Sequence, residues 1–287
     1  MRVLMLAIPI CGGDKPALHS QLRLLRQVFA SARIWQYMVG AAVLLNVVTI
    51  RADDGGAVGE KADTSVFARR AERVFKEAKA RVQSEPGKAE ALLDFGRVCY
   101  DWADYSTTKS QRAEIANQGI DACRKLVAQD AKSVGGHYYL AMNLGQLAQT
   151  KTLGALKLVS QMETEFRTAL SLDAKYDYAG PDRNLGLLYW QAPGWPTSLG
   201  SNSKARTHLT AALKAAPEYP ENALNLIEAE LKWGDKPGVT RDFKTLNENW
   251  EAAKKKLTGE EWASSWADWE KRKAAAEKKL PTADGRK

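Results

Sequence analysis

The sequence has few of the residues from which catalytic and metal sites are usually built. Its 287 residues include only three histidines and three cysteines. There is no His-x3-His or Cys-x2-Cys pair, no glycine-rich phosphate loop and no Gly-x-Ser-x-Gly turn. We therefore predict that the protein is not an enzyme and that it holds no metal and no cofactor.

Strand-like patterns are also scarce. Alternating runs of Val, Ile and Thr, which are typical of β-strands, are nearly absent after residue 60. Alanine, leucine, lysine and glutamate dominate instead, and the hydrophobic share of 45% is that of a soluble globular core. This composition predicts an all-α protein.

Positive charge is in excess, but it is unevenly placed. Of the net charge of +8, residues 1–52 carry +5, because they contain six Lys or Arg residues and one Asp. The remaining chain is only slightly basic. A nucleic-acid-binding domain usually concentrates Lys and Arg in its folded body, so we predict no nucleic-acid partner.

The first 52 residues have the plan of a secretory signal peptide. Three basic residues precede an uncharged stretch over 34–50, and Ala52 follows shortly after it. We expect cleavage after Ala52, export to the periplasm or cell envelope, and a linker over 53–65. The alternative is an uncleaved N-terminal membrane anchor, although 17 uncharged residues are fewer than the about 20 apolar residues that a spanning helix needs.

Without this leader the chain keeps two cysteines, Cys99 and Cys123. An even number of cysteines in an exported protein favours a disulfide between them. The alternative is a pair of buried free thiols in helix cores.

Three segments of the chain resemble one another at a fixed spacing. Residues 123–132, 166–175 and 209–218 align with two successive offsets of 43 residues. Equal spacing of this kind is typical of a repeat protein in which similar units stack on each other.

Each unit combines two helices in a pattern that resembles the tetratricopeptide repeat. The clearest unit carries Leu-Gly-x-x-Tyr and then Ala-x3-Leu-x2-Ala-x4-Pro, on Leu185, Gly186, Tyr189, Ala205, Leu209, Ala212 and Pro217. The small residues allow close helix approach and the proline ends the second helix. We therefore predict stacked antiparallel helix hairpins, a tetratricopeptide-like α-solenoid, over 66–245. The period exceeds the usual 34 residues, which places long loops near 104–112, 150–155 and 191–203.

Residues 134–234 also resemble a narrower family. The stretches 137–145, 180–189 and 192–195 look like the T-component family associated with tripartite periplasmic (TRAP) transporters. This resemblance implies an envelope protein that works with a solute-binding partner protein. Helical repeats serve many partners, so the likeness predicts fold better than function.

The C-terminal stretch 246–280 is predicted to form a helix that caps the last repeat, and 281–287 a disordered tail. Trp262, Trp266 and Trp269 are spaced to share one helix face. An open array needs such a cap. The alternatives are subunit association, which would make the protein a homo-oligomer, and binding to a membrane surface.

In stacked hairpins the first helix of each unit lines the concave face. Polar and aromatic residues at inward positions are predicted to bind a partner or ligand: Asp94, Arg97, Tyr100, Tyr139, Asn143, Gln146, Arg183, Asn184 and Trp190. Such a mixture suits a peptide or a small polar ligand. The alternative is structural: Arg183 and Asn184 bridge helices, while Tyr139 and Trp190 belong to the core.

Trp195 lies in a turn-rich Ala-Pro-Gly-Trp-Pro loop, where it either projects as a binding anchor or folds back on the repeat.

Three functions follow from these features. The first is a scaffold that engages another protein, such as a transport receptor. The second is a small-molecule carrier, favoured by a buried cavity bordered by Tyr139, Arg183 and Trp190. The third is a structural oligomer, favoured by an exposed tryptophan stripe.

Overall fold

The computed structural model describes residues 57–151 and 153–280, with side chains from Val66 onward. The predicted leader over 1–52, the side chains of the predicted linker and the tail over 281–287 lie outside this range. These three predictions are therefore not tested by the structure.

Every regular element of the described residues is a helix, as the sequence predicts. Within this part of the chain the helices are α3 (Ala57–Ser84), α4 (Ala89–Ala103), α5 (Lys109–Gln129), α6 (Val134–Thr150), α7 (Ala155–Leu172), α8 (Tyr176–Gln191), α9 (Asn202–Ala215), α10 (Pro220–Trp233), α11 (Lys236–Lys256) and α12 (Glu260–Glu277).

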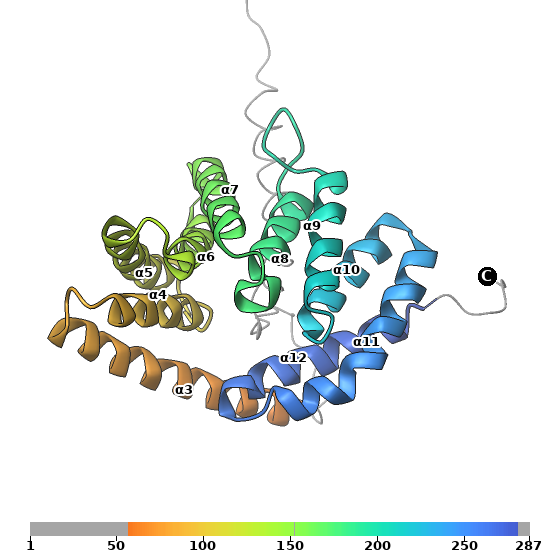
Figure 1. The fold of residues 1–287 in the computed structure, drawn as a ribbon. Coiled ribbons are helices and arrows are strands. Elements are labelled where there is room, and N and C mark those ends of the chain that lie inside the picture. Colours follow the sequence, from red (N-terminus) through yellow and green to blue (C-terminus); the bar gives the residue numbers. More distant parts are fainter. Residues whose placement is uncertain (1–56, 152, 281–287) are drawn as a thin grey trace, which may run out of the picture.

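The helices pack in successive pairs, which confirms the predicted tetratricopeptide-like solenoid (Figure 1). Small residues lie where paired helices come closest. A Cβ atom added to Gly186 of α8 would stand 2.7 Å from Leu209 Cγ of α9, so only glycine fits there. Ser201 caps α9 by accepting a hydrogen bond from the Lys204 amide at 3.3 Å.

The hairpins follow a curve that brings the two ends of the described chain together (Figure 1). Near its N-terminal end, α3 approaches the start of α12. Arg70 and Arg73 of α3 lie 3.6 and 3.7 Å from Glu260 of α12. These ion pairs join the two ends of the described chain.

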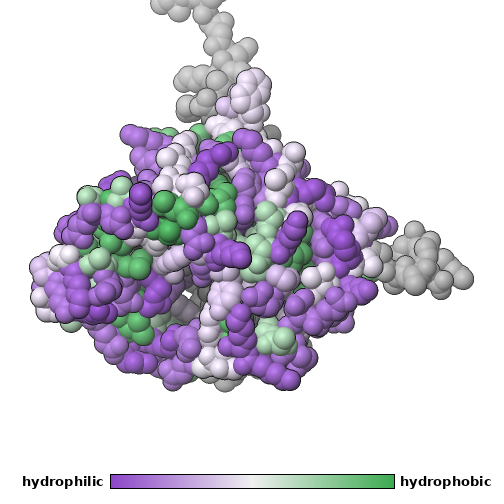
Figure 2. All heavy atoms as spheres, in the orientation of Figure 1, coloured by the Kyte–Doolittle hydropathy of each residue, from purple (hydrophilic) through white to green (hydrophobic). Residues whose placement is uncertain are grey.

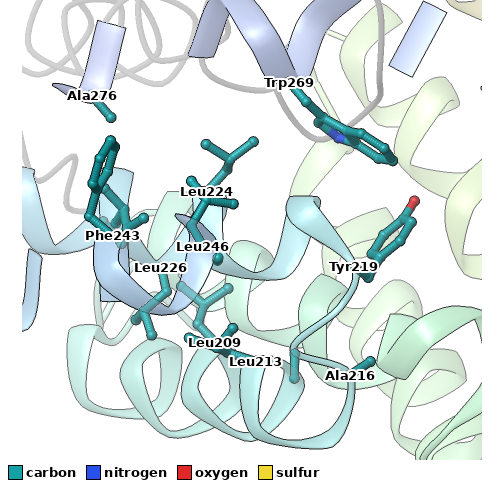
Figure 3. Close-up of a cluster of buried hydrophobic side chains, with 14 of the residues drawn as sticks. Leu209, Leu213, Ala216, Tyr219, Leu224, Leu226, Phe243, Leu246, Trp269 and Ala276 are labelled. Carbon is teal, nitrogen blue, oxygen red and sulfur yellow. The ribbon is translucent and has the colours of Figure 1, made fainter. Parts of the chain in front are cut away.

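The C-terminal helix α12 caps the last hairpin, as predicted. The indole of Trp269 is fully buried and lies next to the ring of Tyr219 (Figure 3), with the ring centroids 5.3 Å apart. Trp266 packs edge-to-face on Trp250 and donates a hydrogen bond to the Leu257 carbonyl at 2.6 Å. The segment 246–280 thus holds the end of α11 as well as α12.

Between residues 57 and 280, no described helix combines the length and the apolar character needed to cross a membrane.

Candidate functional site

A central cavity of about 480 Å³ lies on the inner face of the solenoid. Figure 2 shows a small opening near the centre of the face viewed in Figure 1. Helices α3, α4, α6, α8 and α12 contribute the wall, together with Tyr219 and Glu221 at the start of α10. The cavity therefore depends on both ends of the described chain as well as on the repeats.

The wall combines aromatic rings with an excess of acidic groups. The aromatic residues are Phe67, Tyr100, Tyr105, Tyr138, Tyr139, Tyr219 and Trp262, the arginines are Arg70, Arg97 and Arg183, and the carboxylates are Asp101, Asp104, Asp177, Glu221, Glu260 and Glu261. Helical periodicity explains much of this set, because residues three, four and seven apart share one face of a helix.

A left-handed backbone segment borders the cavity at the start of α8. Asp177, Tyr178 and Ala179 have φ angles of 50°, 55° and 62°. For residues other than glycine, this conformation costs about 1–2 kcal/mol each. Arg183 holds the segment by donating hydrogen bonds to the carbonyls of Asp177 and Tyr178 at 3.1 and 3.2 Å. Strained backbone that the surrounding structure holds in place is typical of functional sites.

The hydroxyl of Tyr138 joins this segment to α6. It donates to Asp177 Oδ2 at 2.6 Å and accepts from Asn184 Nδ2 at 2.9 Å. The same Asp177 oxygen accepts from Arg183 at 2.7 Å. Burial and the negative charge of Asp177 raise the pKa of Tyr138 well above its usual value, so its proton stays available for donation.

Arg97 and Asp101 form a second polar group on α4. The guanidinium of Arg97 contacts Asp94 at 2.8 Å and Asp101 at 3.4 Å. The Asp101 side chain is 46% accessible, on the side that lines the half-open cavity. Burial raises its pKa to about 6, because the opposing charge of Arg97 offsets only part of the desolvation cost.

Asp104 is the residue that directly follows α4. It lies one turn beyond Asp101 and is more deeply buried. Its Oδ1 accepts a hydrogen bond from Gln146 Nε2 at 2.5 Å and lies 3.7 Å from Arg112. Its Oδ2 is buried and accepts no hydrogen bond. Burial raises the pKa of Asp104 to about 8 against the opposing effects of Gln146 and Arg112.

Five residues predicted from the sequence meet at the cavity: Arg97, Tyr100, Tyr139, Arg183 and Asn184. Asp94 stands beside them through its ion pair with Arg97. The structure thus brings most of the predicted concave-face residues together, and it also gives Arg183 and Asn184 the bridging contacts of the alternative interpretation.

The other predicted residues lie elsewhere. Asn143 and Gln146 are buried between α6 and α4, where Asn143 Nδ2 donates to the Gly96 carbonyl at 2.8 Å. Trp190 packs against Trp233, with ring centroids 6.4 Å apart. Trp195 projects from the loop between α8 and α9 and is 89% exposed. A binding role for these four residues stays a prediction.

Sequence reasoning missed Asp101 and Asp104, which follow Arg97 at the fourth and seventh positions of the same helix face. That spacing could have identified them. The contributions of α3 and α12, such as Arg70 and Glu260, have no comparable sequence pattern, because they depend on how the two ends of the solenoid meet.

Cys99 and Cys123 are free, buried thiols in the structure. Burial raises the pKa of Cys123 to about 12 and that of Cys99 further. Cys123 Sγ lies against the backbone of Gly96, within the closest approach of α4 and α5. A disulfide between the two cysteines stays a prediction.

Among the described residues, no group of three His, Cys, Asp or Glu side chains is arranged to hold a metal ion. The two described histidines have carboxylate partners. His137 Nδ1 lies 2.6 Å from Glu165, and His208 Nδ1 lies 2.7 Å from Asp182. Both pairs join neighbouring helices.

One family model matches part of the chain. Residues 59–179 match the family described as "Regulator of microtubule dynamics protein 1-3". The match runs from α3 to the left-handed segment of α8 and covers less than half of the chain. No curated protein matches this sequence.

Two solved structures resemble the fold. A thermophilic tetratricopeptide-repeat protein of Thermus thermophilus is 19% identical with a TM-score of 0.54, and the alignment covers 76% of this chain and 96% of that one. MamA is 20% identical with a TM-score of 0.43, covering 71% of this chain and 98% of that one. The first likeness supports a tetratricopeptide-like fold and says nothing of the ligand.

Proposed function

We propose that this protein is an interaction scaffold that holds part of a partner in its central cavity. The observation that carries this proposal is the cavity on the inner face, where seven aromatic rings and nine charged groups surround about 480 Å³. A tetratricopeptide-like solenoid commonly binds other proteins on its concave side.

The polar groups of the cavity are held in place before any partner arrives. Arg183 is fixed by Asp177 and Tyr138, and Arg97 by Asp94 and Asp101. A pre-arranged site loses less conformational entropy on binding. Its volume is large enough for a few side chains of a partner segment, within the range of about 300–1,000 Å³ typical of ligand pockets.

A small-molecule carrier is the second candidate, and the volume of the same cavity favours it. Tyr139 and Arg183 border the cavity as this function requires. Trp190 does not, because its ring packs against Trp233 outside the lining.

The setting of the protein is also part of the proposal. We propose export to the cell envelope through the leader and a transport-related partner, as the resemblance to the T-component family suggests. The tryptophan stripe does not favour a homo-oligomer, because Trp262, Trp266 and Trp269 pack on the hydrophobic core of the chain itself. Trp195, at the tip of an exposed loop, offers a second contact for a partner.

The test uses the full chain as bait in an extract of its own cell envelope, with bound molecules identified by mass spectrometry. The Ala71→Trp variant fills the cavity from α3, and Ala80→Trp places the same residue on an exposed part of that helix. Both variants are first compared with the wild type by circular dichroism.

A partner that is captured by the wild type and Ala80→Trp, but lost with Ala71→Trp, would support the scaffold. A small molecule with the same dependence would support the carrier. Capture that is equal with all three proteins would contradict a binding role of the cavity. Protease protection in intact cells and after outer-membrane release tests export separately.

A further inference from the structure

We infer that the loops of two neighbouring hairpins form a surface that rests on an anionic lipid bilayer. This surface, which we call the Trp195 edge, consists of the α6–α7 loop with the start of α7 and the α8–α9 loop with the start of α9. The inference goes beyond the binding function proposed for the cavity, which these residues do not line. It takes a lipid surface as the partner that Trp195 contacts.

The two loops emerge at the same side of the molecule, at the top of Figure 1. Ala192 and Leu199 of the α8–α9 loop pack on the hydrophobic cluster that also holds Leu158 and Val159 near the start of α7. The hairpin repeat explains this position, because the loop within each antiparallel pair returns to the same side of a stacked array. Side chains that project from both loops can therefore contact one common surface.

Large apolar side chains are exposed mainly on this edge. Among the described residues, five large hydrophobic side chains are exposed, and three of them lie here: Leu153, Leu156 and Trp195. Trp195 is 89% and Leu153 is 82% exposed, whereas Val66 follows at 51%. Because burial of apolar surface is favourable, their grouping on one edge indicates a surface that becomes covered.

The backbone of the α8–α9 loop holds Trp195 away from the rest of the protein. The Gly200 amide donates a hydrogen bond to the Pro193 carbonyl at 2.9 Å. The Ser201 amide donates to the Tyr189 carbonyl at 2.8 Å and so fastens the loop to the end of α8. A loop fixed in this way loses little conformational entropy when its tip is bound.

The charge of the edge is positive. No Asp or Glu occurs in residues 131–162 or 183–217, which contain both loops and the helix starts. Lys151, Lys157 and Lys204 are exposed there, and neither segment supplies a counter-charge to them. The edge is thus complementary to a negatively charged surface.

Cations and aromatic rings lie together where the edge continues towards α10. Lys204 Nζ lies over the Tyr189 ring at 5.0 Å, and the Arg206 guanidinium lies over the Trp233 ring at 4.6 Å. Arg206 also pairs with Asp235 at 2.6 Å, so it contributes less free charge than the lysines. Tryptophan, tyrosine and lysine are side chains that suit the interface between lipid headgroups and acyl chains.

A bilayer fits this edge better than a protein pocket does. Leu153 lies between Lys151 and Lys157 in the sequence, and Trp195 projects from a different loop. A protein interface usually has an apolar core that is depleted of charge. Lipids rearrange around each inserted side chain, and anionic headgroups attract the lysines beside it. The mixture of apolar tips and lysines therefore matches a lipid surface.

The test measures whether Trp195 enters a bilayer. The full chain is mixed with vesicles of phosphatidylcholine and phosphatidylglycerol whose acyl chains carry bromine, which quenches tryptophan fluorescence on contact. The chain has nine tryptophans, so the emission of Trp195 is taken as the difference between the wild type and Trp195→Phe. Brominated vesicles of phosphatidylcholine alone show the role of the anionic headgroup.

Two double variants test the charge, each made with and without Trp195→Phe. Lys151→Glu with Lys157→Glu reverses two charges on the edge. Lys175→Glu with Lys214→Glu changes the net charge equally at exposed positions, just before α8 and in the last turn of α9, at the other end of these hairpins. Circular dichroism first compares all variants with the wild type.

We expect brominated anionic vesicles to quench more than about half of the Trp195 emission, and neutral vesicles less than about a tenth. The Lys151 and Lys157 double variant should reduce this quenching at least about fivefold at equal lipid concentration, as should high salt. The Lys175 and Lys214 double variant should behave like the wild type. Trp195 emission that anionic vesicles leave unchanged, or equal effects of the two double variants, would overturn the inference.

Capture from the envelope extract tests for a protein at the same edge. If a partner is lost with Trp195→Ala while anionic vesicles leave Trp195 unquenched, the edge binds a protein and the inference is wrong. The function proposed for the cavity is judged separately, because it depends on the contrast between Ala71→Trp and Ala80→Trp.

Discussion

Two buried groups of charges, one around Arg272 and one around Asp104, differ in how completely they are paired. Arg272 of α12 is 3% exposed and contacts Glu221 at 2.8 Å and Glu228 at 2.8 Å. It also donates to Asn225 at 2.6 Å. Asp104, by contrast, accepts one hydrogen bond from Gln146 on Oδ1 and none on Oδ2.

The pKa values of the two acids move in opposite directions for this reason. Burial alone would raise the pKa of Glu221, but the charge and hydrogen bonds of Arg272 and Trp269 outweigh it and lower the pKa. Burial dominates at Asp104 and raises its pKa to about 8. The Arg272 group thus stabilises the cap of the solenoid, whereas the Asp104 group keeps one buried acceptor atom without a hydrogen bond.

The largest effect is expected for Arg272→Met. It leaves Glu221 buried without its cation, which costs about 3–5 kcal/mol when one partner of a buried pair is removed. Urea unfolding at pH 7 measures this loss, with the exposed Arg167→Met as control. A loss below about 1 kcal/mol would show that the two charge groups do not differ as described.

Asp104→Asn is expected to stabilise the protein at pH 8 by about 1–3 kcal/mol, because it removes a poorly compensated buried charge. The pKa of Asp104 is higher in the folded state than the ordinary value of 3.8. The wild type therefore loses stability as pH rises from about 4 to about 8, and the gain in the variant should vanish near pH 4. Unfolding at pH 4, 6 and 8 checks this, and a gain that does not depend on pH would contradict the assignment.

Tyr138→Phe is expected to destabilise the protein by about 1–2 kcal/mol. The change removes the hydroxyl that joins Asp177, Arg183 and Asn184. It leaves one N–H of Arg183 and one of Asn184 without an acceptor, while Asp177 Oδ2 keeps its hydrogen bond from Arg183. Thermal unfolding followed by circular dichroism measures the loss. The control is Tyr176→Phe, because Tyr176 is next to Asp177 in α8 and is less buried than Tyr138. An equal loss of stability in both variants would argue against a special role of the Tyr138 hydroxyl.

The smallest effect is expected for Glu260→Gln at the closure of α3 on α12. The Glu260 side chain is 78% exposed and lies 3.6 and 3.7 Å from the two arginines. Exposed ion pairs of this kind contribute less than about 1 kcal/mol and are screened by salt. Unfolding at low and at high NaCl concentration tests this. A larger loss of stability that does not depend on salt would contradict the weak contribution expected of these exposed ion pairs.

The sequence predicted the all-α class, the helix hairpins and the cap. These depend on local patterns: the repeat of 43 residues, Gly186 opposite Leu209, and the spacing of Trp262, Trp266 and Trp269. Helical periodicity also placed Arg97, Tyr139 and Arg183 on the inner face. It could not separate them from Asn143 and Gln146, because residues on one face can either point into a cavity or pack between helices.

The amino-acid sequence by itself therefore determined which segments are helices and which faces turn inward, since periodicity, capping and helix packing act over a few residues. Only the tertiary structure decided that α3 meets α12, that the inner face holds a cavity, and that Asp104 is left without a full set of partners. The environment of a buried charge depends on residues that are far apart in the chain. These residues come together only when the solenoid folds.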